Sequence, residues 1–501
     1  LKSPTGEIIF NGKSSFQTHN LRSVLEWLKV DVSKVPPDRL RSFMASSDIM
    51  GTAGQLKIAN IVGQLDATRL SGGVTLALRE RPAFGTSFSF DQINVDAYLG
   101  KRFPEESVVV GTGTGESVST GSSSSPVFPL PAGPLVALKK FDANLQLRVG
   151  ALAYQKKTFR DIWLDTTLVN GTLKIRDATV RNFAGTSIKV VGTATRLEDA
   201  PRFSGTVFAE SRDLTGLFHA ADIKSSIPPR KLGQMLLAVE TNITPDRIYI
   251  DADLRLAKSH SKLTGHIIGL TAKPVFDVKL DSYHPKIDRL AELIFGGRSG
   301  AQSGPFIIKA NVKGDPNALR VSAKSEFTDG ELKISGKVNL KEKAPRIDIR
   351  FEINQPDLTR FVRVFYPNYR PVKRRLGNLR LAAEVNGRVD DFKVNNLSGN
   401  IGATIFSGRG DYLKKERRPA VDLVLKSSTI SLSDFFQAPA HTGVMSRDRS
   451  APTPQSKTLT RGVSSSHSRV DQWSRERIDT SALGMLDAEI YLSADTLIYE
   501  S

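Results

Sequence analysis

The chain has 501 residues, no cysteine and a formal net charge of +18, from 70 Lys and Arg against 52 Asp and Glu. This length exceeds what one hydrophobic core supports, so several units are expected. The absence of cysteine excludes disulfides, thiolate metal sites and cysteine nucleophiles. The positive charge favours an anionic surface, either nucleic acid or phospholipid headgroups, and a generally basic soluble protein is the alternative. No base-stacking motif accompanies the basic residues, which disfavours nucleic acid.

Residues 1–102 predict amino-terminal β units with short helices. A strand pattern at 7–10 precedes an amphipathic helix that Asn20 would cap. One face of this helix is apolar and consists of Leu21, Val24, Leu25 and Leu28. A second helical stretch is predicted at 38–45, after two prolines.

A unit of about 72 residues recurs through the chain, and a proline marks the same register in each copy. The five prolines are Pro82, Pro201, Pro274, Pro345 and Pro419, of which the last four stand 71 to 74 residues apart. A glycine stands nine residues before each of them: Gly73, Gly192, Gly265, Gly336 and Gly410. Fourteen residues after them stand side chains of capping type: Asp96, Thr215, Asp288, Thr359 and Ser433. A fixed period is typical of a repeat protein, in which each unit packs against its neighbours.

Each unit carries a strand with one apolar and one polar face, seen most clearly after Pro345. A short helix follows, for which Asp357 and Thr359 are candidate caps. The recurrent apolar positions are the candidate binding residues: Phe84, Phe88, Phe203, Val207, Phe276, Val278, Leu280, Ile347, Ile349, Phe351, Ile353, Val421, Leu423 and Leu425. Stacked copies would align them into one strip, which either packs against a second sheet or stays open as a groove that binds acyl chains. The pattern alone leaves both alternatives open.

The chain divides into five regions. After 1–102, a Gly/Ser/Pro-rich flexible insertion is predicted at 103–137, followed by four tandem β units at 138–439. A disordered linker is predicted at 440–474, and 475–501 would be the truncated start of a further unit. Two tight hairpins are expected, at Asn170-Gly171 and at Asp329-Gly330. Residues 141–154 and 486–499 resemble one another in register, which indicates a higher-order duplication.

No constellation of catalytic residues or of metal ligands stands out, so no enzyme, cofactor or metal is expected. His260 and His266 are the closest histidines and lack a ligand spacing. The densest basic cluster, at 370–380, contains Lys373, Arg374 and Arg375. These three residues are weak candidates for headgroup contact, and a solvated junction between units is the favoured alternative.

Residues 469–499, with their Trp-Ser segment and the strand beginning Leu486-Asp487-Ala488, resemble the carboxy-terminal region of the AsmA family. Residues 141–194 resemble the same region, and residues 72–99 are similar to an amino-terminal motif of that family. The resemblance implies an elongated, mainly β array of antiparallel meander units, each ending in a short helix, that form a twisted groove.

The resemblance also implies a function. It suggests a non-enzymatic periplasmic protein of a Gram-negative bacterium that carries phospholipid acyl chains between the inner and outer membranes. The implied localisation is the periplasm, with an inner-membrane anchor that this chain lacks. The chain begins at Leu1 without methionine and ends within an apparent strand, which suggests a fragment. The alternative is a scaffold for outer-membrane protein assembly, with assembly proteins as partners and no lipid cargo.

Overall fold

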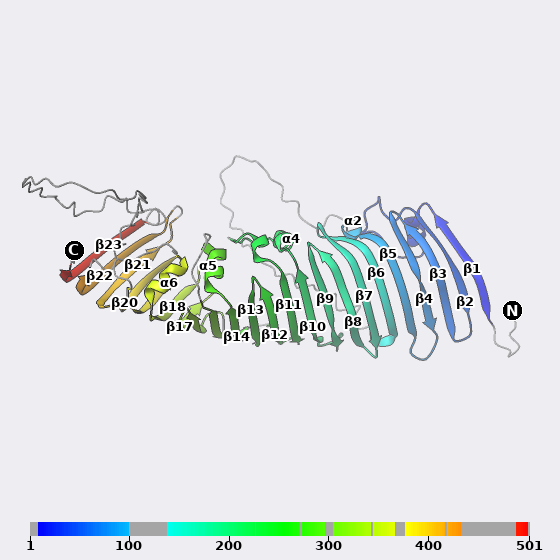
Figure 1. Ribbon diagram of the computed structural model, residues 1–501. Helices are drawn as coiled ribbons and strands as arrows, with labels where there is room; N and C mark the ends of the chain where they lie inside the picture. Colours follow the sequence, from blue (N-terminus) through cyan, green and yellow to red (C-terminus); the bar gives the residue numbers. More distant parts are fainter. Residues whose placement is uncertain are drawn as a thin grey trace, which may run out of the picture. The chain divides into compact units, whose positions relative to one another are not determined.

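The computed structural model describes residues 9–99, 138–225, 227–270, 273–295, 304–341, 344–365, 376–415, 418–431 and 487–498. The fold is mainly β, as the alternation of apolar and polar residues predicts, and consists of open meander sheet with short helices between strands (Figure 1). Contacts divide the chain into two compact units. Unit 1 comprises 1–285, 293–295 and 307–319, and unit 2 comprises 286–292, 296–306 and 320–501.

Unit 1 contains fourteen consecutive strands, each paired with the next along the chain. Their bounds are β1 Phe10–Thr18, β2 Phe43–Gly51, β3 Gln55–Leu65, β4 Thr68–Ala77, β5 Ala83–Asn94, β6 Asp142–Tyr154, β7 Lys157–Val169, β8 Thr172–Phe183, β9 Thr186–Thr195, β10 Arg202–Ser211, β11 Met235–Ile243, β12 Arg247–Leu256, β13 Ser259–Ile268 and β14 Val275–His284. All of these pairings are antiparallel except β5–β6, which is parallel.

Unit 2 contains a second run of paired strands, from β17 to β23. Their bounds are β17 Gly330–Asn339, β18 Arg346–Gln355, β19 Leu379–Arg388, β20 Asp391–Ile401, β21 Thr404–Leu413, β22 Ala420–Ser431 and β23 Asp487–Ile498. Again all pairings are antiparallel except one, β22–β23. The division between the units passes through β15 (Phe306–Gly314) and β16 (Leu319–Phe327).

Short helices follow the last strand of each of the first four repeats, as expected, and the residues directly after β22 lie outside the described ranges. The helical elements are α1 Leu21–Trp27, α2 Val95–Leu99, η1 Leu138–Lys140, α4 Thr215–Ala220, η2 Pro229–Leu232, α5 Ile287–Phe295 and α6 Leu358–Phe365. In unit 2, Ile287 and Ala291 of α5, Phe327 of β16 and Val364 of α6 form a buried cluster. The Phe327 and Phe361 rings lie 5.1 Å apart beside it.

The two parallel pairings repeat one another in detail. The Asp142 amide donates to the carbonyl of Pro82, and the Asp487 amide donates to the carbonyl of Pro419, each at 2.9 Å. Ala83 lies opposite Asp142 just as Ala420 lies opposite Asp487. The two segments that the sequence relates therefore occupy the same register relative to the repeat. The antiparallel meander expected from the sequence did not include these two parallel pairings.

Three local predictions were wrong. Residues 38–45 are not helical, because Leu40 has a φ of +59° and β2 begins at Phe43. The second hairpin turns at Thr328 and Asp329, whose φ angles are +42° and +67°, so Gly330 is already in β17. The hairpin at Asn170-Gly171 is confirmed, with φ angles of +51° and +73°.

The third error concerns the capping position. The amide of Arg360 donates to Asp357 Oδ1 at 2.9 Å, so Asp357 is a cap. Thr359 lies inside α6 instead, and its Oγ1 accepts from the Leu376 amide at 2.7 Å. Asp96 likewise lies within α2, where it accepts from the amides of Gln155 and Lys156.

Candidate functional site

The fourteen predicted binding residues lie on the strands that end each repeat, namely β5, β10, β14, β18 and β22. Every one of them is partly exposed, and none is buried. Side chains in the core of a closed sandwich are covered on both sides. The apolar side of these strands is therefore not sealed beneath a second layer.

Within unit 1, cross-strand pairing aligns these residues into continuous rows. The row that contains Phe88, Val207 and Leu280 is apolar at each of twelve strands. It runs through Ile61, Gly72, Phe88, Leu147, Leu164, Ala178, Val190, Val207, Val239, Ala252, Leu263 and Leu280.

A second row contains Phe84, Phe203 and Phe276 and crosses all fourteen strands of unit 1. It runs through Phe10, Gly51, Leu56, Leu76, Phe84, Ala143, Leu168, Leu173, Ala194, Phe203, Ile243, Ile248, Ile267 and Phe276. We call the side of the sheet that carries these rows the apolar face. Because cross-strand neighbours on one face lie about 5 Å apart, the apolar face is continuous along unit 1.

The row between these two contains smaller residues. It includes Thr86, Gly192, Gly205, Gly265 and Val278. A Cβ on Gly265 would stand 2.3 Å from the Asp277 carbonyl oxygen, and one on Gly205 would stand 2.3 Å from that of Val191. Glycine is required there because neighbouring backbones approach too closely for a side chain, a feature that bends sheets.

Unit 2 shows the same arrangement around its own strands. One row passes through Val338, Ile347, Gly387, Phe392, Tyr412, Val421 and Ala488. A second passes through Gly336, Ile349, Val385, Val394, Gly410, Leu423 and Ile490. The Phe392 and Tyr412 rings are stacked at 4.6 Å. The predicted residues of β18 and β22 are therefore brought into common rows within this unit.

The opposite face of the sheet is polar and carries ion pairs between neighbouring strands. Lys262 Nζ lies 3.4 Å from Asp251 Oδ1, and Lys189 Nζ lies 3.2 Å from Asp177 Oδ2. Asp253 Oδ2 lies 2.5 Å from His260 Nε2 on the same face. Within the described ranges no group of three or more potential metal ligands occurs.

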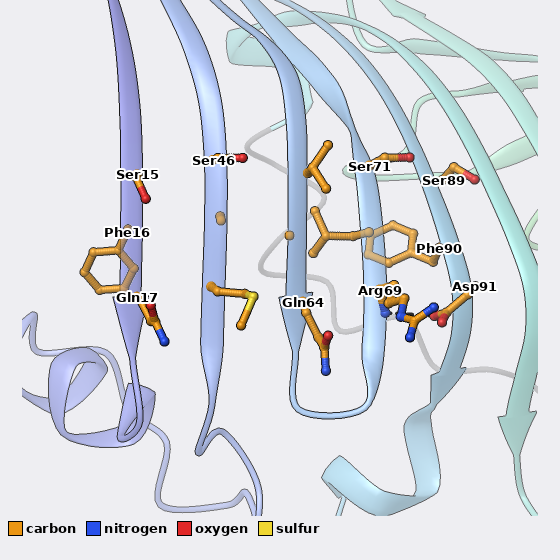
Figure 2. Close-up of a pocket in the computed structure, with 15 residues that line it drawn as sticks. Ser15, Phe16, Gln17, Ser46, Gln64, Arg69, Ser71, Ser89, Phe90 and Asp91 are labelled. Carbon is orange, nitrogen blue, oxygen red and sulfur yellow. Dashed lines mark hydrogen bonds between the residues drawn. The ribbon is translucent and has the colours of Figure 1, made fainter.

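A hollow of about 670 Å³ lies on β1–β5 of unit 1. Its apolar floor is a fourth row on the apolar face, formed by Phe16, Ala45, Gly63, Leu70 and Phe90. Figure 2 shows Phe16 and Phe90 on separate strands, with polar side chains, among them Gln17, Gln64 and Arg69, beside them. An apolar floor with a polar rim suits an amphipathic molecule.

At the end of β10, β14 and β18, a buried polar side chain binds the preceding hairpin. Ser211 Oγ donates to the carbonyls of Gly185 (3.2 Å) and Asp213 (2.9 Å). Gln355 Nε2 donates to the carbonyls of Thr328 and Asp357, both at 3.1 Å. His284 Nε2 lies 3.2 Å from the carbonyl oxygen of Ala257. We call these three residues, each ten positions after its proline, the latch residues.

The sequence reading missed the latch residues because their types differ, although their position is constant. The constant position, counted from the proline, was the signal that could have found them. In the first repeat the same position holds Gln92, which is exposed and whose Nε2 donates to the carbonyl of Ala67 at 3.2 Å. A further contact is made there by the Tyr98 hydroxyl, which donates to Asp66 Oδ2 at 2.9 Å. Burial and this hydrogen bond raise the pKa of Tyr98 to about 12.

Asp66 also anchors the loop before β2. Burial alone would raise the pKa of Asp66, but hydrogen bonds from Tyr98 and from the amides of Leu40, Arg41 and Ser42 outweigh it and lower that pKa. The repeat edge is therefore fixed by polar contacts, and the apolar face is left free of them.

The weak headgroup candidates Lys373, Arg374 and Arg375 lie outside the described residues, as do the insertion at 103–137 and the linker at 440–474. Among the helices that the structure describes, none has the length and apolar character needed to span a membrane.

No protein-family model, curated protein or solved structure matches this chain.

Proposed function

We propose that the chain is a non-enzymatic lipid carrier that holds phospholipid acyl chains on its apolar face. The observation that supports this proposal is the continuity of apolar rows across β3–β14, in which most side chains are partly exposed, with the ion pairs Lys262–Asp251 and Lys189–Asp177 on the other face. Soluble monomers rarely expose apolar patches beyond a few hundred Å², and larger ones indicate a ligand. Acyl chains fit because each buried methylene contributes roughly 0.8 kcal/mol without needing a specific polar partner.

The dimensions of unit 1 suit several acyl chains. Neighbouring strands are about 4.8 Å apart, so fourteen strands extend over roughly 60 Å. An acyl chain in one leaflet spans about half of the ~30 Å hydrocarbon core of a bilayer. A track several acyl lengths long favours passage of lipids along the array over storage of a single ligand.

The proposed location and route come from the resemblance to the AsmA family, which implies the periplasm and transport between the inner and outer membranes. The absence of cysteine is compatible with an oxidising compartment. In this proposal, phospholipids and membranes are the partners of the chain.

Lipid extraction and native mass spectrometry of the purified chain test the proposal. We expect co-purifying phospholipid, with more than one molecule bound per chain. Recovery of lipid-free protein under mild conditions, together with no uptake of fluorescent phospholipid from vesicles, would refute it.

A matched pair of variants locates the bound lipid. Ile349→Asp places a charge on the apolar face of β18, and Arg350→Asp places the same charge on the opposite face one residue later. We expect Ile349→Asp, like Phe351→Asp, to block lipid transfer while the flanking strands stay folded. Arg350→Asp should transfer lipid as the unmodified chain does. If Ile349→Asp and Arg350→Asp lost lipid transfer equally, the apolar face would have no special role in it.

A further inference from the structure

The segment that ends α1 exposes three neighbouring apolar side chains in unit 1. Trp27 is 80% exposed, Leu28 is 57% exposed and Val30 is 47% exposed. Trp27 is the most exposed of the large hydrophobic side chains in the part of the chain that the structure describes. We call residues 26–30 the apolar knob.

The backbone holds the apolar knob in a fixed conformation. The amide of Lys29 donates to the Glu26 carbonyl and that of Val30 to the Leu25 carbonyl, both at 2.9 Å. Lys29 has a φ of +59°. These features define a Schellman motif, which ends a helix in a defined turn.

A half-buried arginine fixes the loop that follows. Arg22 donates from its guanidinium to the carbonyls of Val32 (3.0 Å), Val35 (2.7 Å) and Pro36 (2.6 Å). Val32 is only 6% exposed, so the loop is packed back onto the helix. The exposure of Trp27 is thus part of a rigid local structure and not a consequence of fraying.

We infer that the apolar knob is a membrane-interface anchor that inserts into the headgroup region of a phospholipid bilayer. Three side chains are far too small a surface for a stable protein partner, which needs about 800 Å² on each side. Tryptophan prefers the bilayer interface, where its ring is apolar and its N–H remains wet. Lys29, between Leu28 and Val30, can extend its amine to anionic headgroups. This inference does not depend on lipid cargo on the apolar face.

Vesicle flotation of the full chain tests the inference, with 3:1 phosphatidylcholine–phosphatidylglycerol vesicles as the probe. A variant with Trp27→Ser, Leu28→Ser and Val30→Ser keeps the backbone bonds of the motif and all contacts of Arg22. We expect its vesicle affinity to fall about tenfold or more. The matched control replaces three exposed apolar residues of unit 2, Val389, Ile405 and Leu413, with serine and should float like the unmodified chain.

A second readout follows Trp27 directly. In a Trp163→Phe, Trp473→Phe background, Trp27 is the sole tryptophan. We expect its emission to shift to the blue on vesicle addition and to be quenched by brominated lipid. Flotation without quenching, equal flotation of the serine variant, or no flotation of the unmodified chain would each overturn the inference. Concentration-dependent dimers that the serine substitutions abolish, without vesicle binding, would assign the knob to a second copy and overturn it as well.

Discussion

The strand half and the helix half of one repeat differ in where they bury side chains. The fourteen predicted strand positions are all partly exposed, whereas residues at the start of three following helices are buried: Leu214 is 1% exposed, Ile287 6% and Leu358 8%. The latch residues Ser211 and Gln355 are also buried, at 1% and 0%. Both halves read as apolar in sequence, but the predicted strand positions are not among the buried core residues.

This difference separates stability from ligand binding. The array is stabilised by the backbone hydrogen bonds between its strands and by the buried contacts at the end of each repeat, where the helix follows the strand. The apolar face can then remain uncovered. Substitutions in the two halves should have opposite consequences: those at the edge unfold the chain, and those on the face affect its cargo.

The largest effect is expected from Leu214→Ala. Because Leu214 is almost fully buried at the start of α4, the change removes packed methyl groups and leaves a cavity, at about 3 kcal/mol of unfolding free energy. Leu280→Ala, on the apolar face of β14, is the matched control and should lose only about 1 kcal/mol. Urea unfolding with hydrogen exchange of β10 and β14 measures both. Equal losses would mean that the apolar face is a core after all.

Gly336→Ala tests the close approach within the sheet. A Cβ there would stand 2.2 Å from the Asp348 carbonyl oxygen and 2.6 Å from Ile349 Cα, at a φ of +157°. We expect a loss of about 2 kcal/mol, measured by the urea midpoint, because β17 must move away from β18. Gly54→Ala is the control, since no atom lies within 4 Å of the position that its Cβ would occupy, and it should be near neutral. A tolerated Gly336→Ala would show that the strands can separate there.

The period-2 pattern was sufficient to predict the strands and the apolar face, because successive side chains of a strand point to opposite faces of the sheet. It placed Phe88, Val207 and Leu280 on one face, and the pairing registers bring them into one row. It did not decide whether that face is covered, since a sandwich strand and an open strand alternate in the same way.

Errors arose where contacts distant in sequence determine the local structure. Residues 38–45 have helical periodicity, but the amides of Leu40 and Arg41 bind Asp66, and the next residues pair with β1. Thr359 is a capping residue type, yet its hydroxyl binds Leu376 in a later segment. The latch position accepts Ser, His or Gln because each can reach a carbonyl, and residue identity alone therefore conceals it.

Tyr98→Phe tests the hydrogen bond between Tyr98 and Asp66 in the first repeat. Loss of the hydrogen bond to Asp66 should lower the unfolding free energy by about 1 kcal/mol near neutral pH. The pKa of Tyr98 is raised from 10.0 to about 12, so its contribution is full below pH 10 and disappears as the pH rises through 12. The pKa of Asp66 is lowered, so the contribution of its carboxylate is full above about 3.8 and is lost as the pH falls through the lowered value.

The free energies of unfolding of Tyr98→Phe and of the unmodified chain, compared as a function of pH, check the direction of each contribution. We expect the difference between the two proteins to be constant from pH 6 to pH 9 and to shrink above pH 10. A difference that grows with alkaline pH would contradict the assigned direction of the tyrosine pKa.

The smallest effect is expected on the polar face, from Lys262→Ala. Its ammonium lies 3.4 Å from Asp251 but is more than half exposed, so solvent and salt screen the pair. The unfolding free energy should change by less than about 0.5 kcal/mol, and lipid retention should not change. Leu263→Asp, one residue later on the apolar face, should instead abolish lipid retention, because it places a charge in the row between Ala252 and Leu280. If Lys262→Ala released lipid while Leu263→Asp retained it, the cargo would lie on the charged side of the sheet, and the assignment of the two faces would have to be reversed.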